Sequence, residues 1–152
     1  MREQFALSLR TAMKAKDTQR ISTIRLINAA IKDRDIAIRS EENVKGVSDE
    51  EILSILGKMV KQRQESARQF EEAGRLELAE QELKEIDIIE TFLPKQMTKE
   101  EMMDIVDQTI KEKKANSIRD MGKVMGFLKK EYAGRMDFSQ AGSRAKEVLS
   151  KS

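Results

Sequence analysis

Residues 90–101, ETFLPKQMTKEE, contain the single proline of this 152-residue chain and divide its sequence into two helical parts. Pro94 disfavours the helical conformation at Leu93, because the proline ring crowds the backbone of the preceding residue. Four residues further on, Thr98 and Glu101 have the spacing of a capping box, which starts a helix. The stretch therefore predicts a boundary between two domains, residues 1–93 and residues 94–152.

On the N-terminal side of this boundary, apolar residues recur at three- and four-residue steps, which predicts helices. The first helix is expected within residues 3–15, and Asp17 or Thr18 is expected to cap the second. A polar break at 40–47 follows the second helix. The predicted core positions of these two helices are Phe5, Leu9, Ala12 and Met13, then Ile21, Ile24, Ile27 and Ile31.

Two further helices are expected before the boundary, which makes about four in this part. Ser48 and Glu51 form a second capping box, and the helix that they start should run to about Phe70. Gly74 is expected to end it, since glycine is favoured just after a helix. The fourth helix has an apolar stripe of Leu76, Ala79, Leu83 and Ile86 and a strongly acidic outer face.

After the boundary, the same periodicity predicts three helices. One begins at Thr98, one contains residues 121–133, and one begins at Asp137 or Ser139 and runs through Leu149. Seven glycines and one proline are few turn-formers for this length, and no strand pattern occurs. The sequence therefore predicts an all-α protein, with a helical N-terminal domain of about four helices followed by a C-terminal three-helix domain.

The composition excludes several chemistries. The chain contains no cysteine and no histidine, so it has neither thiolate nor imidazole for catalysis or metal binding. Gly122 and Gly126 are one residue too close for a phosphate-binding loop, and Ser143 with Lys146 lacks the partner motifs of acyl-transfer enzymes. No run of 18 apolar residues occurs. We expect a soluble cytoplasmic protein with no membrane association, no cofactor, no metal and no catalytic residue.

The segment 121-MGKVMGFLKKEYAGRMD-137 is the strongest candidate for a binding surface. At 100° per residue its apolar side chains fall on one face, and Gly122 and Gly126 lie directly beside that face. Lys123, Lys129 and Lys130 flank the strip that the glycines leave without side chains. Two interpretations are open: the glycines let a neighbouring helix pack closely, or they let a phosphate backbone approach.

Charge is distributed unevenly along the chain. Residues 1–39 carry 9 basic and 4 acidic side chains, residues 40–94 carry 7 and 14, and residues 95–152 carry 13 and 9. The basic parts permit an anionic partner. The acidic helix expected in residues 71–90 permits a different function, that of an adaptor that docks a basic protein.

Three segments together resemble the YqeY family, also called GatB/YqeY-like proteins, which are small bacterial proteins. They are 23-TIRLINAAIKDRDI-36, 92-FLPKQMTKEEM-102 and 121-MGKVMGFLKKEYAGRMD-137, so the similarity covers essentially the whole chain. The part from about Pro94 on is similar to the tail domain of the B subunit of tRNA-dependent amidotransferases. Those enzymes convert Glu-tRNA(Gln) or Asp-tRNA(Asn) to the amide, and their tail is thought to meet the tRNA.

The resemblance implies a tRNA-facing block in the C-terminal part. Met136 departs from the family, which often has alanine there. The candidate RNA-binding residues are Gly122, Lys123, Gly126, Lys129, Lys130, Gly134 and Arg135.

The leading hypothesis is a non-catalytic helical module that binds tRNA or another structured RNA through the surface of residues 111–135. A protein–protein adaptor that uses residues 71–90 is the alternative. A third is an accessory subunit of a carbon–nitrogen ligase with glutamine as amido-N-donor, an activity to which the family resemblance is linked.

Overall fold

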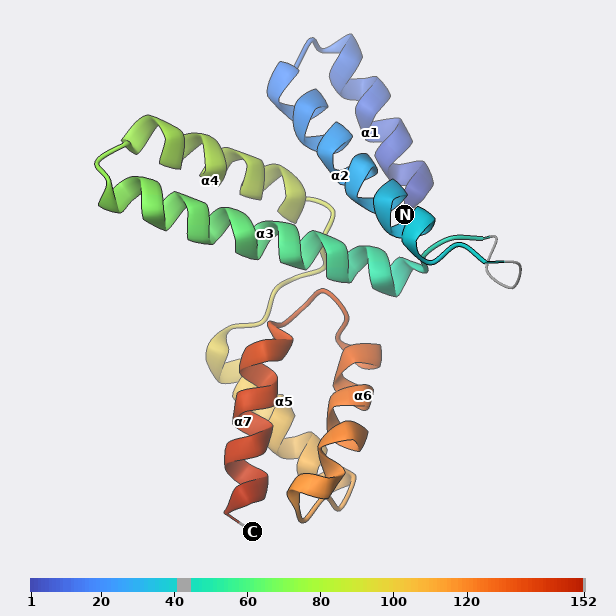
Figure 1. Cartoon of the computed structure of the whole chain (residues 1–152), viewed down its shortest axis with the longest axis vertical. Helices are drawn as coiled ribbons and strands as arrows, with labels where there is room; N and C mark the ends of the chain where they lie inside the picture. Colours follow the sequence, from blue (N-terminus) through green and yellow to red (C-terminus); the bar gives the residue numbers. More distant parts are fainter. Residues whose placement is uncertain (41–44, 152) are drawn as a thin grey trace. The chain divides into compact units, whose positions relative to one another are not determined.

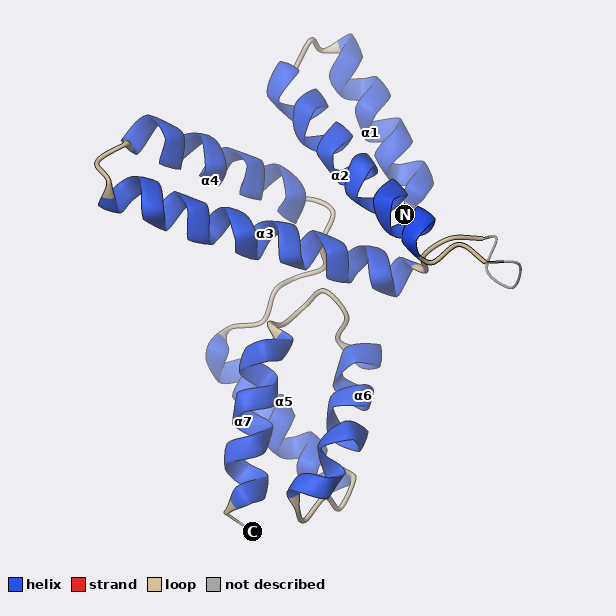
Figure 2. Ribbon diagram, viewed as in Figure 1, coloured by secondary structure: helices blue, strands red, loops and turns tan. Residues whose placement is uncertain are grey.

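The computed structural model describes residues 1–40 and 45–151, and these residues form only helices, turns and loops (Figure 2). The all-α prediction is confirmed. Contacts between Cα atoms group the residues into two compact units, one ending at Leu93 and one beginning at Pro94. Each unit has its own hydrophobic core. The assignment of the two units as separate domains stays a proposal.

The first unit consists of two helical hairpins (Figure 1). Helices α1 (Arg2–Lys14) and α2 (Thr18–Ala37) form one, and α3 (Asp49–Glu72) and α4 (Leu76–Glu90) form the other. The centre of the polar break expected at 40–47, residues 41–44, lies outside the described residues.

Local sequence signals place the ends of these helices. The Asp17 side chain accepts a hydrogen bond from the amide of Arg20 at the start of α2, and the Ser48 hydroxyl accepts one from the amide of Glu51 at the start of α3. Gly74 has a φ of +75° in the turn between α3 and α4. The predicted stop at Gly74 lies between the two helices, because α3 ends at Glu72 and α4 begins at Leu76. The acidic helix expected in residues 71–90 is therefore α4, and the first residues of that range belong to the end of α3 and the turn.

The core of the first unit joins both hairpins. Phe5 of α1 and Phe92, which follows α4, meet edge to face with 4.9 Å between ring centroids. An ion pair between Arg63 Nε and Glu85 Oε2, at 2.9 Å and largely shielded from solvent, links α3 to α4. The buried apolar core consists of Phe5, Ile24, Ile27, Ile31, Val47, Ile52, Leu56, Met59, Val60, Ile86, Ile89 and Phe92.

Three residues predicted to lie in this core are exposed instead. Leu76 and Leu83 of α4 are 67% and 45% exposed, and Met13 of α1 is 50% exposed. Ala79 and Ile86 are buried as predicted. On α4 the two leucines lie at the edge of the buried face, about 40–60° from Ala79 at 100° per residue. Periodicity identifies the apolar side of a helix, but the neighbouring elements decide how much of it is covered.

The second unit is a three-helix arrangement of α5 (Lys99–Glu112), α6 (Met121–Glu131) and α7 (Phe138–Ser150), with the short 3₁₀ helix η1 (Ile118–Asp120) before α6. The Thr98 hydroxyl accepts a hydrogen bond from the amide of Glu101, as the capping box predicts. An ion pair with two hydrogen bonds, at 3.0 and 2.8 Å, connects Arg144 of α7 to Asp107 of α5. The buried apolar core consists of Met102, Val106, Ile110, Val124, Leu128, Met136, Ala141, Ala145 and Leu149.

Candidate nucleic-acid interface

Helix α6 presents two different sides. Val124 and Leu128 are fully buried on the side that faces α5 and α7. The exposed side carries five of the seven predicted RNA-binding residues. They are Gly122, Lys123, Gly126, Lys129 and Lys130. The fold of the second unit therefore brings these five residues onto one solvent-facing surface, which we call the α6 face.

The two glycines of the α6 face do not accommodate another helix of the unit. A Cβ atom added to Gly122 or Gly126 would meet no described atom within 4 Å. Gly142 of α7 shows the contrast, since its Cβ would lie 3.7 Å from Met125 Cε of α6. Close helix packing within the unit therefore does not explain Gly122 and Gly126.

Local contacts hold Lys123 and its neighbours in place. Lys123 Nζ donates a hydrogen bond of 3.2 Å to the carbonyl of Lys113, the residue that follows α5. Lys113 Nζ in turn lies 4.4 Å from the centroid of the Phe127 ring, a cation–π contact. Lys123 therefore has a structural role in addition to any contact with an anion.

Lys129 and Lys130 lie in the last turn of α6, and both are exposed. Neither forms an ion pair with another described residue. Cations at a helix C-terminus interact favourably with the helix dipole, which is a structural reason for lysine at these positions. The same exposure leaves both ammonium groups accessible to an external anion.

Gly134 and Arg135 lie in the turn after α6, and their contacts are with the segment that precedes α5. The Gly134 carbonyl accepts a hydrogen bond from Gln96 Nε2, and Arg135 Nε donates one of 3.1 Å to the Lys95 carbonyl. The amide of Met97 donates to the Arg135 carbonyl at 2.9 Å. These two residues therefore fasten the first residues of the unit to the α6–α7 turn, and their contact with RNA stays a prediction.

Three exposed cations near the α6 face were not named among the candidate residues, although they lie within the expected surface of residues 111–135. Lys111 lies in the last turn of α5, Lys114 follows that helix, and Arg119 lies in η1. The hydrogen bond from Lys123 to Lys113 brings the start of α6 against this end of α5. The sequence shows these cations as part of a stretch rich in basic residues, 111–130. The stretch alone does not show which of its side chains share a surface.

Among the described residues, no group of three histidine, cysteine, aspartate or glutamate residues could hold a metal ion. The pKa of Glu82 in α4 is raised, first by burial and then by the nearby carboxylate of Glu85. Glu85 is paired with Arg63, which makes this cluster a structural contact between α3 and α4. No helix of the described residues is both long and apolar enough to cross a membrane.

The chain belongs to the YqeY family, since the family model described as "Yqey-like protein" matches residues 2–149. This confirms the resemblance found in the sequence. Curated relatives carry the name "Altered inheritance of mitochondria protein 41, mitochondrial". The protein of that name from Clavispora lusitaniae is 35% identical over 115 residues, which cover 76% of this chain and 61% of the relative.

Two further relatives of the same name are more distant. The one from Saccharomyces cerevisiae is 29% identical over 103 residues, which cover 68% of this chain and 52% of the relative. The one from Kluyveromyces lactis is 34% identical over 85 residues, which cover 55% and 43%. The chain therefore spans between about two fifths and three fifths of the length of these relatives.

These relatives correct the expected location. The prediction of a cytoplasmic protein is wrong by this comparison, because the relatives are fungal proteins named as mitochondrial. That prediction depended mainly on the absence of cysteine, which indicates a reducing compartment. A reducing compartment can be the cytoplasm or the mitochondrial matrix, and composition does not separate the two.

Proposed function

We propose that this YqeY-family chain is a non-catalytic module that binds tRNA or another structured RNA through the α6 face. The observation that carries the proposal is the open space over Gly122 and Gly126. An interior glycine costs a helix about 0.5–1 kcal/mol relative to alanine. No described contact within the unit offsets that cost at these two positions, so we infer that an external molecule approaches the bare backbone.

The chemistry of the α6 face suits a sugar–phosphate backbone. Gly122 and Gly126 are one turn apart, about 6 Å along the helix axis, and they leave a strip that a large ligand can approach closely. Lys123, Lys129 and Lys130 provide ammonium groups, which bind phosphates as point charges. Such contacts position a nucleic acid and read little of its sequence.

Two of the three aromatic rings of the unit, those of Phe127 and Tyr132, favour structured RNA over single strands. Single-strand binding uses exposed rings on which bases stack. Lys113 covers the ring of Phe127, and the Arg135 guanidinium lies 5.7 Å from the centroid of Tyr132. Both rings already have a cation on them, which supports recognition of a folded RNA by shape and phosphate contacts.

A titration of labelled tRNA with matched glycine variants tests the proposal. Gly126→Gln fills the bare strip with a neutral side chain, and we expect tRNA affinity to fall by on the order of tenfold. Gly57→Gln is the control, because Gly57 of α3 is also a helical glycine whose added Cβ would meet no described atom within 4 Å. Equal effects of the two substitutions would contradict binding at the α6 face.

A second titration, over a range of salt concentrations, tests the lysines. For Lys129→Gln/Lys130→Gln we expect the log–log salt slope to become shallower by about 0.9 for each phosphate that a lysine no longer neutralises. Lys58→Gln in α3 should leave the slope unchanged. Wild-type slope and affinity in the double variant would overturn the proposal. Amide formation on misacylated tRNA by the pure chain would instead support the accessory-ligase alternative.

A separate observation favours protein binding as a second candidate function. The first half of α4 exposes Leu76 and Leu83 together with Glu77 and Glu80. Apolar side chains rimmed by charges are typical of protein interaction sites. This surface belongs to the first unit, so it can be tested independently of the α6 face.

A further inference from the structure

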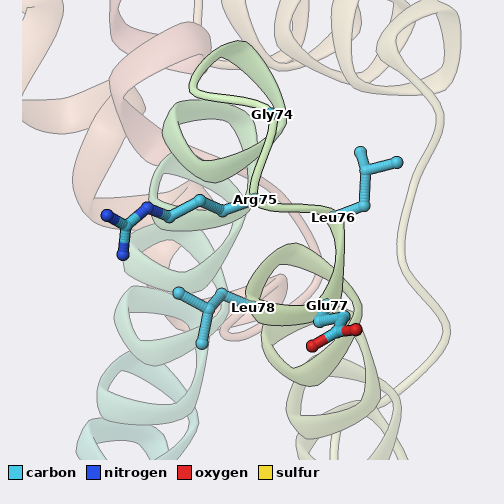
Figure 3. Close-up of a pocket in the computed structure, with 5 residues that line it drawn as sticks. All are labelled: Gly74, Arg75, Leu76, Glu77 and Leu78. Carbon is cyan, nitrogen blue, oxygen red and sulfur yellow. The ribbon is translucent and has the colours of Figure 1, made fainter.

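The turn between α3 and α4 ends in an exposed apolar and acidic surface. We call it the acidic tip, and it consists of Leu76, Glu77, Glu80 and Leu83. Arg75, the cation of this turn, points to the opposite side from Leu76 (Figure 3). Glu80 forms an ion pair of 3.7 Å with Lys84, whereas Glu77 forms none with another described residue, so the acidic character of the tip rests mainly on Glu77.

The end of the other hairpin has the complementary character. A shallow hollow lies where α1 turns into α2, and we call it the basic hollow. Its apolar floor includes Met13 and Leu26, which are 50% and 43% exposed, and Lys16 and Arg25 are its cations. The residues that line the basic hollow are Met13, Lys16, Thr18, Ile21, Ser22, Arg25 and Leu26.

The groups around the basic hollow leave it positive. Asp17 is the carboxylate in the turn, and it is engaged as the N-cap of α2 by accepting the amide of Arg20. Neither Lys16 nor Arg25 forms an ion pair with another described residue. An acidic partner with apolar side chains would therefore match the hollow in both charge and polarity.

We propose that two copies of this chain form a two-fold dimer, in which the acidic tip of each copy docks in the basic hollow of the other. Complementary charge supports this occupant, because both halves of the contact are present on one chain. The two surfaces lie at the ends of different hairpins that point apart (Figure 1). A copy cannot fill its own hollow with its own tip.

The two-fold arrangement gives a closed assembly with two identical contacts. In an isologous dimer, residue i of one subunit meets residue j of the other, and the reverse contact also forms. Leucines of the tip and Met13, Ile21 and Leu26 of the hollow would supply the apolar centre. Glu77 facing Lys16 and Arg25 would set the orientation, as a rim charge does at protein interfaces.

Sedimentation equilibrium of the full chain over a range of concentrations tests the dimer. Arg25→Glu and Glu77→Arg each place like charges at both contacts, and we expect each variant alone to dimerise about tenfold or more weakly than the wild type. An equimolar mixture of the two variants should restore association. In the mixed dimer one contact pairs the introduced glutamate with the introduced arginine, and the other contact is wild type.

A pair of neutral substitutions provides the matched control. Leu76→Gln should weaken the dimer, whereas Ile36→Gln should leave it unchanged, because Ile36 is 61% exposed and lies outside both surfaces. Far-UV circular dichroism of each variant checks that the helices remain. A chain that stays monomeric up to roughly 1 mM, or single variants whose mixture associates no better than either alone, would overturn the proposal and point to another occupant.

Discussion

Gly46 before α3 and Gly126 in α6 show two different reasons for a glycine. Gly46 has a φ of +82°, and a Cβ there would collide with the Asp35 carboxylate. That carboxylate accepts two hydrogen bonds from Arg2 and one from the amide of Val47. Gly126 has neither a positive φ nor a close neighbour among the described residues. The fold needs the first glycine, whereas the second weakens its helix, and we explain it by a ligand.

The largest expected effect is that of Gly46→Ala, which tests whether the fold requires glycine at this position. A positive φ costs a residue with a side chain about 1–2 kcal/mol, and forcing a methyl group against Asp35 adds about 1–3 kcal/mol. We expect the free energy of unfolding to fall by about 3 kcal/mol in urea titrations. An unchanged urea midpoint would show that the Arg2–Asp35–Val47 contacts can rearrange at no cost.

Gly74→Ala separates the two causes. Gly74 has a φ of +75°, but its added Cβ would meet no described atom within 4 Å. Only the backbone strain remains, so we expect a decrease of about 1 kcal/mol in the free energy of unfolding, measured in the same titrations. A decrease as large as that of Gly46→Ala would mean that backbone conformation alone, and not the contact with Asp35, explains both positions.

Gly126→Ala should change stability in the opposite direction. We expect an increase of about 0.5–1 kcal/mol in the free energy of unfolding, since alanine is the better helix former and has room here. The same increase is expected for Gly57→Ala in α3. A less stable Gly126→Ala variant would contradict the distinction between Gly46 and Gly126, because it would show that the fold itself requires glycine at this position of α6.

The smallest expected effect concerns acid pH at the same Asp35. The hydrogen bonds from Arg2 and from the Val47 amide lower the pKa of Asp35 from 3.8 to about 2. Because the folded pKa is the lower one, this contribution to stability is complete above the ordinary value and is lost as the pH falls through about 2. The unfolding free energies of the wild type and Asp35→Asn should therefore converge over that range. A constant difference between the unfolding free energies of the two proteins over this pH range would contradict a stabilising role of the Asp35 carboxylate.

Much of the helical architecture could be predicted because its signals are local. Thr98 and Ser48 cap α5 and α3 as their spacing with Glu101 and Glu51 indicates. A cap joins residues three positions apart, so the necessary information lies within a few residues. The exposure of Leu76, Leu83 and Met13 could not be predicted in this way, because it depends on which distant element covers each helix face.

The candidate site also has one part that could be predicted from local sequence and one part that could not. The arrangement of Gly122, Gly126 and the lysines of α6 follows from helical geometry, and all five residues are exposed. Gly134 and Arg135 belong to the same stretch of sequence, yet their contacts are with Lys95 and Gln96. A pairing between segments so far apart in the chain leaves no local signal.

The sequence by itself determined that this chain is helical, where α2, α3, α5 and α7 begin, and which family it belongs to. Caps, periodicity and family motifs are properties of neighbouring residues. Only the tertiary structure decided which apolar residues stay exposed and that no described atom packs over Gly122 and Gly126. Burial is a relation between segments far apart in the chain. The same glycine pattern would fit a packed helix or an open surface until the neighbouring helices are in place.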